Sequence, residues 1–142
     1  MDPIKEPLTS DSMLLNLAIE LKIPLDYIIF REDIRGINFN TRKAICLIIN
    51  LDDKENQGTH WVAAYKPQNI AKIYYFDSYG VGPPLELLSL KKSIFYNDKQ
   101  IQSIYSGGCG QFCLSFLGEM TKKNNKTPKQ KYKQFMNSFN FA

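Results

Sequence analysis

The chain has 142 residues, of which 44% are hydrophobic and 23% are charged, a composition that favours one globular domain with one core. Its longest strongly apolar run, residues 44–49, is far too short to cross a bilayer, and its polar, acidic start is not typical of a secretory signal. The formal net charge of +4 is compatible with a polyanionic partner but does not require one. We therefore expect an intracellular, non-secreted protein that does not bind membranes.

The first elements in chain order are a helix and a buried strand. Thr9 or Ser10 can cap a helix whose leucines recur at helical spacing, and Pro24 ends it. Residues 43–50 are β-branched and almost wholly apolar, which is typical of a strand buried on both faces.

The middle of the chain predicts a hairpin followed by a helix. Residues 59–66 and 72–79 have the pattern of two neighbouring strands joined by a short turn. Proline near the start of residues 84–97 favours an amphipathic helix there, and residues 99–106 are a short strand candidate.

The last third of the chain predicts two helices. Glycines open residues 107–120, which then become helical, and a lysine-rich stretch at 121–133 leads to a short C-terminal helix bearing Phe135, Met136 and Phe139. Helices therefore flank a mainly consecutive set of strands, which indicates a single α+β domain over residues 1–142.

The three cysteines differ in their surroundings. Their number and spacing match neither a disulfide framework nor a zinc site, so we expect free thiols in a reducing compartment. Cys46 lies in an apolar strand and Cys113 lies one turn into an apolar helix, which favours core packing for both. Cys109 stands between glycines where a helix begins, and free N–H groups there stabilise a thiolate. Local sequence supports a nucleophile and a gap-filling residue equally.

His60 is the only histidine, and it precedes a predicted strand, whereas Asp77 ends the next one. Alone, each is typical of an ordinary structural residue. A cysteine nucleophile, however, needs a base, and the base needs an acceptor on its other ring nitrogen. Side chains on adjacent strands can meet across the sheet, so His60, Asp77 and Cys109 together predict a catalytic triad.

The segments "GTHWVAAY", "YYFDSYG" and "QSIYSGGCGQF" carry a resemblance to a known family. In order, they supply His60-Trp61, Asp77, Gln102 and Cys109-Gly110. This order resembles that of the adenovirus-proteinase and SUMO-protease clan of cysteine proteases, and most closely the maturation proteases of adenoviruses, virophages and Polinton-like mobile elements. The likeness runs from about residue 43 to residue 120.

The resemblance implies a permuted papain-like fold, in which helices pack a central mixed sheet, and a thiol mechanism. Cys109 would attack the carbonyl, His60 would accept the thiol proton and return it to the leaving amine, and Asp77 would orient His60. The side chain of Gln102 and the backbone N–H of Cys109 would form the oxyanion hole.

The resemblance also implies a substrate. Trp61, Gly108 and Gly110 would form a narrow channel that admits glycine before the scissile bond, although Trp61 is equally typical of core packing. The expected activity is cleavage after glycine in viral capsid or core precursors, by a monomer, in the virion and the infected cell. No metal or other cofactor is required, and the resemblance allows activation by DNA or by a peptide.

Three alternatives stay open. The same site could remove ubiquitin-like modifiers as an isopeptidase, or the fold could be a catalytically silent binding module, against which the intact triad argues. The third is a nucleic-acid-binding protein that uses the lysine-rich stretch, which is otherwise typical of a solvated face. Its candidate contacts are Lys122, Lys123 and Lys126.

Overall fold

The computed structural model describes residues 11–52, 60–101 and 108–139. Its centre is a five-stranded mixed sheet whose strands lie side by side in the order of the sequence. β1 is parallel to β2 and β5 is parallel to β4, whereas β3 is antiparallel to both of its neighbours, β2 and β4. The strands are β1 (Tyr27–Phe30), β2 (Ile45–Asn50), β3 (Trp61–Lys66), β4 (Lys72–Phe76) and β5 (Ser93–Tyr96).

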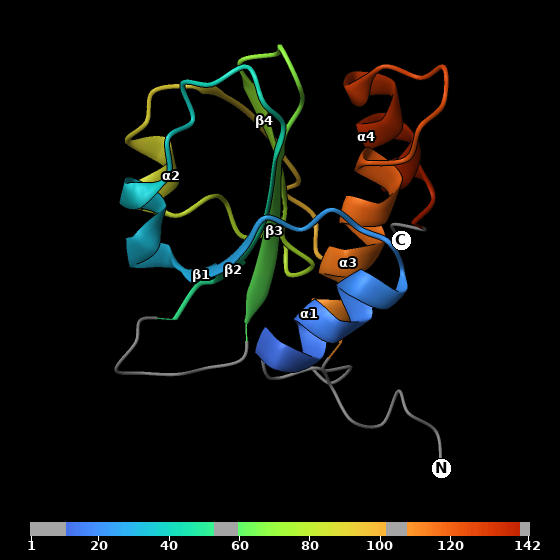
Figure 1. Ribbon diagram of the computed structural model, residues 1–142, viewed down its shortest axis with the longest axis horizontal. Coiled ribbons are helices and arrows are strands. Elements are labelled where there is room, and N and C mark those ends of the chain that lie inside the picture. The colour runs from blue at the N-terminus through green and yellow to red at the C-terminus, as the bar shows by residue number, and fades with distance from the viewer. Residues whose placement is uncertain (1–10, 53–59, 102–107, 140–142) are drawn as a thin grey trace.

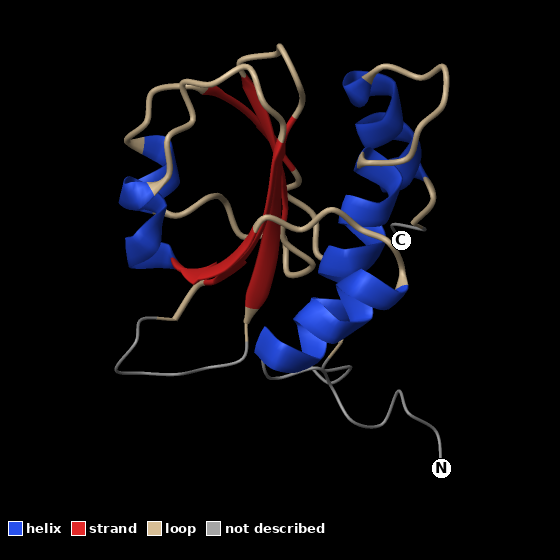
Figure 2. Cartoon of the chain, viewed as in Figure 1, coloured by secondary structure: helices blue, strands red, loops and turns tan. Residues whose placement is uncertain are grey.

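Helices cover both faces of the sheet (Figures 1 and 2). One face carries α1 (Asp11–Glu20), α3 (Cys109–Met120) and α4 (Pro128–Asn137), and the other carries the 3-10 helix η2 (Arg31–Gly36) and the short α2 (Leu85–Leu88). Within the described residues, no helix combines the length and hydrophobicity needed to span a bilayer. The predicted α+β class is confirmed.

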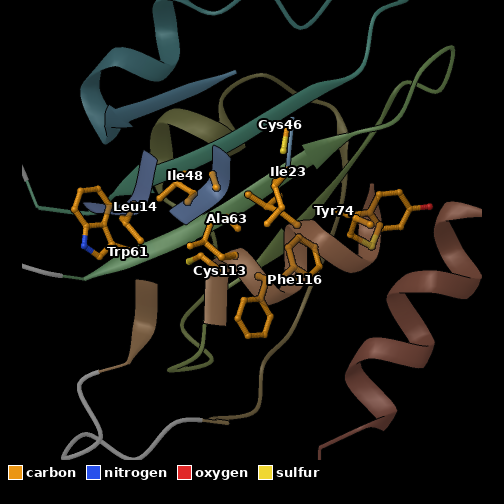
Figure 3. Close-up of a cluster of buried hydrophobic side chains, with 14 of the residues drawn as sticks. Leu14, Ile23, Cys46, Ile48, Trp61, Ala63, Tyr74, Cys113 and Phe116 are labelled. Atoms are coloured by element: carbon orange, nitrogen blue, oxygen red, sulfur yellow. The ribbon is translucent and has the colours of Figure 1, made fainter. Parts of the chain in front are cut away.

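The alternation of side chains along β2 divides the core into two clusters. Cys46 and Ile48 point to the cluster beneath α3, where Phe116 lies (Figure 3). Leu47 and Ile49 point to the cluster under η2 and α2. Because successive strand residues face opposite sides and both sides are covered, every residue of β2 is buried.

The predicted helix over residues 84–97 is confirmed only at its start, where α2 follows Pro84, and is wrong beyond it. α2 ends at Leu88, and Ser93–Tyr96 forms β5 instead. Lys91 has a φ of 56°, in the left-handed region that interrupts a helix. The β-branched and aromatic residues that follow pair in parallel with β4, a tertiary contact that overrides local helix propensity.

The strand candidate at 99–106 is not found in its described part. Residues 99–101 form no strand, although the N–H of Ile101 donates to the carbonyl of Ser78 at 2.8 Å. The remainder of this candidate lies outside the described residues.

The lysine-rich stretch is partly helical rather than a simple connection. Thr127 and Gln130 cap the start of α4 reciprocally, each side chain accepting from the other's backbone N–H, with Pro128 in the first turn. β1 and η2 were not predicted, because four strand residues followed by a single 3-10 turn leave little periodicity to read.

Candidate active site

The β3–β4 pair places the predicted base and its acceptor at one edge of the sheet. The strands are antiparallel, so the start of β3 lies beside the end of β4. His60 directly precedes β3, and Asp77 directly follows β4. Nε2 of His60 donates to Oδ1 of Asp77 at 2.9 Å, and the Asp77 side chain is completely buried. The aspartate therefore fixes the orientation of the imidazole ring from inside the protein.

Helix α3 brings the third residue to the same edge. Cys109 is its first residue, and α3 packs against β3. The backbone N–H of Trp61 donates to Sγ of Cys109 at 3.4 Å, so the sulfur lies beside the His60-Trp61 pair. With 6% of its surface exposed, Cys109 lies at the edge of the core. The three predicted triad residues are thus gathered from three separate elements.

The surroundings of His60 favour its charged form. Burial lowers its pKa, but the hydrogen bonds and negative charges of Asp77 and Cys109 outweigh that effect and raise the pKa to about 9. Nδ1, the ring nitrogen that does not face Asp77, is buried and has no hydrogen-bond partner of standard geometry among the described residues. The ring can therefore carry a proton on each nitrogen at neutral pH, and Nδ1 can exchange its proton with a neighbouring thiol.

The other two cysteines lie in the hydrophobic cluster beneath α3. Burial, with a further effect of the negative charge of Asp26, raises the pKa of the Cys46 thiol to about 12. Burial also raises the pKa of Cys113 well above its ordinary value, and the nearby Cys109 and Asp77 raise it further. Both thiols are therefore protonated and inaccessible, as expected of core residues.

Tyr79 is a neighbour of the site that sequence reasoning missed. Its ring stacks on the His60 ring, with centroids 4.3 Å apart and planes 13° apart. Its backbone N–H donates to Oδ1 of Asp77 at 2.8 Å, so this one oxygen accepts from two donors. Tyr79 therefore limits the movement of both the base and the acceptor.

Asn97 was also missed, and it holds the backbone of Asp77. Its Oδ1 accepts from the Asp77 N–H at 3.0 Å, and its Nδ2 donates to the Asp77 carbonyl at 2.6 Å. Gly80, with a φ of 73°, lets the same loop approach closely, because a Cβ there would lie 2.6 Å from the carbonyl carbon of Lys99. The loops that follow β4 and β5 are thereby fixed together. Only a correct assignment of β5 could have placed Asn97 beside Asp77.

The remaining predicted site residues have varied outcomes. Gln102 lies outside the described residues. Gly108 and Gly110 flank Cys109 at the start of α3. Trp61 is 4% exposed and belongs to the cluster beneath α3, with its Nε1 buried and unpartnered among the described residues. Core packing of Trp61 is thus observed, and its role in a substrate channel stays a prediction.

The lysines proposed to contact nucleic acid follow α3. Lys122 pairs with Glu119 at 3.1 Å on the exposed surface, and Lys126 donates to the side chain of Gln134. Lys123 is exposed. Contacts of this kind occur on ordinary solvated surfaces, and DNA binding stays a prediction.

The burial pattern predicts selective alkylation of Cys109. A brief pulse of iodoacetamide at pH 7 should modify Cys109 at least tenfold faster than Cys46 or Cys113, because only Cys109 lies beside a protonated imidazole. Mass spectrometry of tryptic peptides measures the three rates. His60→Ala should slow modification of Cys109 alone, since it removes that positive charge. Faster labelling of Cys46 or Cys113 in the folded protein would contradict the assignment.

Comparisons with known proteins give one sequence relative and one fold. No protein-family model matches the chain. The chain is 29% identical to the protease of Bovine adenovirus C serotype 10 over 99 residues, covering 55% of this chain and 49% of that protein. The chain therefore spans about half the length of that relative.

The fold is similar to that of the ASFV pS273R protease, with a TM-score of 0.56, 17% identity, and coverage of 99% of this chain and 71% of that chain. The selenomethionine form of the same protease gives a TM-score of 0.51 at the same identity and coverage. This likeness confirms the predicted papain-like arrangement of a mixed sheet packed by helices. The adenovirus sequence match and the shared fold together confirm the predicted likeness to the adenovirus-proteinase and SUMO-protease clan of cysteine proteases.

Proposed function

We propose that the protein is a viral cysteine endopeptidase that uses Cys109, His60 and Asp77 to cleave protein precursors after glycine. The observation that carries the proposal is the buried hydrogen bond from His60 to Asp77, 2.9 Å long, beside a cysteine that begins a helix. A nucleophile, a base and an orienting carboxylate in one place are the requirements of thiol catalysis. The viral proteases that the chain resembles support the reaction class.

Transfer of the Cys109 thiol proton to His60 gives a thiolate beside an imidazolium, the charged form of His60 that its raised pKa favours at neutral pH. The resulting thiolate attacks the carbonyl carbon of the scissile peptide bond, and a tetrahedral oxyanion forms. His60 then gives its proton to the leaving amine as the C–N bond breaks, which leaves a thioester on Cys109. Water, deprotonated by His60, hydrolyses the thioester and restores the thiol.

The start of α3 provides part of the oxyanion site. The N-cap of the helix is Gly108, which has no side chain to occupy the first N–H groups. The backbone N–H of Cys109 is therefore proposed as one donor to the oxyanion, and the side chain of Gln102 is proposed as the second. A donor of this kind contributes roughly 3–4 kcal/mol to stabilisation of the transition state.

The proposed preference for glycine has a steric basis. Trp61 is the first residue of β3, and its backbone N–H donates to Sγ of Cys109. Its indole is proposed to wall the site next to the nucleophile, where a substrate Cβ beside the scissile bond would meet it. Gly108 and Gly110 let the substrate backbone approach the nucleophile closely. Capsid and core precursors are the proposed substrates because the sequence relative is a viral protease.

A peptide library that varies the residue before the cleaved bond tests this function. Replacing glycine with alanine should lower kcat/KM more than tenfold, which corresponds to about 1.4 kcal/mol in transition-state binding. Trp61→Ala should reduce that glycine–alanine ratio. Phe135→Ala is the matched control, because it truncates another aromatic residue of the same cluster, one that α4 contributes.

Three outcomes distinguish the parts of the proposal. An unchanged ratio in Phe135→Ala shows that lost packing alone does not widen the site. A wild type that cuts equally well after leucine, lysine and glycine would refute the channel. Cleavage only of isopeptide-linked modifiers would move the function to the isopeptidase alternative.

A further inference from the structure

A cavity of about 530 Å³ lies at the end of the sheet opposite to His60 and Asp77. Its lining comes from the end of β3, from the turn that leads into β4, and from the segment that precedes β2. Three cationic side chains contribute to its lining, and none of the described residues that line it is acidic. They are Arg42, Lys66 and Lys92.

Lys66 is the unusual member of this group because it is only 2% exposed. Its Nζ donates to the carbonyls of Lys43 and Pro67, at 3.1 and 3.0 Å. These bonds satisfy two of the three ammonium donors but supply no negative charge. The ion pairs recorded among the described residues do not include Lys66, and a buried charge ordinarily requires such a partner.

Lys92 adds to the positive charge at this place. Burial lowers the pKa of Lys66, and the positive charge of Lys92 lowers it further. The Nζ of Lys92 donates to Oδ1 of Asn40 at 2.8 Å, and Asn40 lies in the segment before β2. Asn69 also lines the cavity, and its backbone N–H donates to the carbonyl of Arg42 at 2.8 Å. Hydrogen bonds thus hold the cationic segments near one another although their charges repel.

We infer that this cavity is a binding site for a small anion bearing several phosphate groups, held by Arg42, Lys66 and Lys92. One phosphate neutralises Lys66, and adjacent phosphates reach the two more accessible cations. Three separate cationic groups and this volume suit a chain of phosphates better than a single carboxylate. Inorganic polyphosphate and a nucleoside triphosphate share this chemistry. The site is independent of the proposed protease mechanism, since it contains none of the triad residues.

Isothermal titration calorimetry with sodium tripolyphosphate at low ionic strength tests the site. We expect one site per chain, and a roughly tenfold or greater loss of affinity in Lys92→Met and in Arg42→Met, because each removes a charge-assisted contact. Lys66→Met should abolish binding. Lys123→Met is the matched control, since it removes the same charge from an exposed position, and it should change affinity less than twofold.

Two further measurements complete the test. Amide chemical shifts should move at residues 42 and 69 on titration and stay fixed at residue 123. Adenosine triphosphate without magnesium distinguishes the sources: tighter binding than tripolyphosphate indicates a nucleotide, and weaker binding indicates inorganic polyphosphate. Because Arg42 and Lys92 are more accessible than Lys66, their variants decide the matter even if Lys66→Met does not fold. No binding of either anion, or equal losses in Lys92→Met and Lys123→Met, would overturn the inference.

Discussion

Cys109→Ala should abolish peptide hydrolysis, with a fall in kcat of about ten-thousandfold or more. The variant keeps the shape of the helix start but removes the only described thiol that lies beside His60. His60→Ala should cause a loss of similar size, because a nucleophile and its base act as one unit and their effects do not add. The double variant should therefore be no worse than either single variant.

Cys46→Ala and Cys113→Ala are the matched controls for this prediction. Each removes one thiol from the core beneath α3, so each should lower the free energy of unfolding by about 1 kcal/mol while leaving kcat within about threefold. Initial rates measured well below the melting temperature separate the two effects. Retained turnover in Cys109→Ala, together with loss of turnover in Cys113→Ala, would show that Cys109 is not the nucleophile.

Asp77→Asn should lower kcat by about a thousandfold to ten-thousandfold. The carboxylate accepts from Nε2 of His60 and from the N–H of Tyr79. An amide in its place can rotate its NH2 group toward the ring, and the imidazole is then held in the wrong tautomer. Asp26→Asn is the matched control, because Asp26 also accepts a backbone N–H, that of Cys46 at 2.8 Å, and should leave kcat nearly unchanged.

The pH profile gives this second prediction an independent readout. His60 has a pKa raised to about 9, so the protonated imidazole persists at neutral pH and is lost as pH rises through that value. Wild-type activity should therefore decline above about pH 9. Removing the charge of Asp77 lowers the pKa of His60, and the decline should begin at a lower pH in Asp77→Asn. A loss of rate with an unmoved alkaline limb would mean that Asp77 has only a structural role.

The meeting of His60 with Asp77 could be predicted because it depends on local geometry. Two apolar runs joined by a short turn form antiparallel neighbours, so a residue before the first and a residue after the second share one edge. Cys109 was predictable for a similar reason, since glycines mark the start of its helix. The positions of the three residues relative to the predicted strands and helix were therefore enough to predict that they meet.

Asn97 and the cationic cavity could not be predicted in this way. Asn97 reaches Asp77 only because residues 93–96 leave the helical pattern and pair with β4. That pairing depends on the rest of the sheet, which a local reading of residues 84–97 does not contain. The cavity likewise joins residues 42, 66 and 92, whose sequence neighbours suggest only ordinary surface lysines and arginines.

If the start of α3 holds the oxyanion as proposed, Gly108 exchanges stability for activity there. Its conformation and surroundings would accept a side chain, since a Cβ would meet its nearest neighbours at 3.6 Å and beyond. Serine or aspartate there would cap the helix and stabilise it by a few tenths of a kcal/mol. A capping oxygen accepts from the second or third N–H of the helix rather than from that of Cys109. It would nevertheless place negative charge, partial for serine and full for aspartate, beside the N–H proposed to stabilise the oxyanion. A screen for thermal stability alone would therefore favour substitutions of Gly108 that lower the proposed activity.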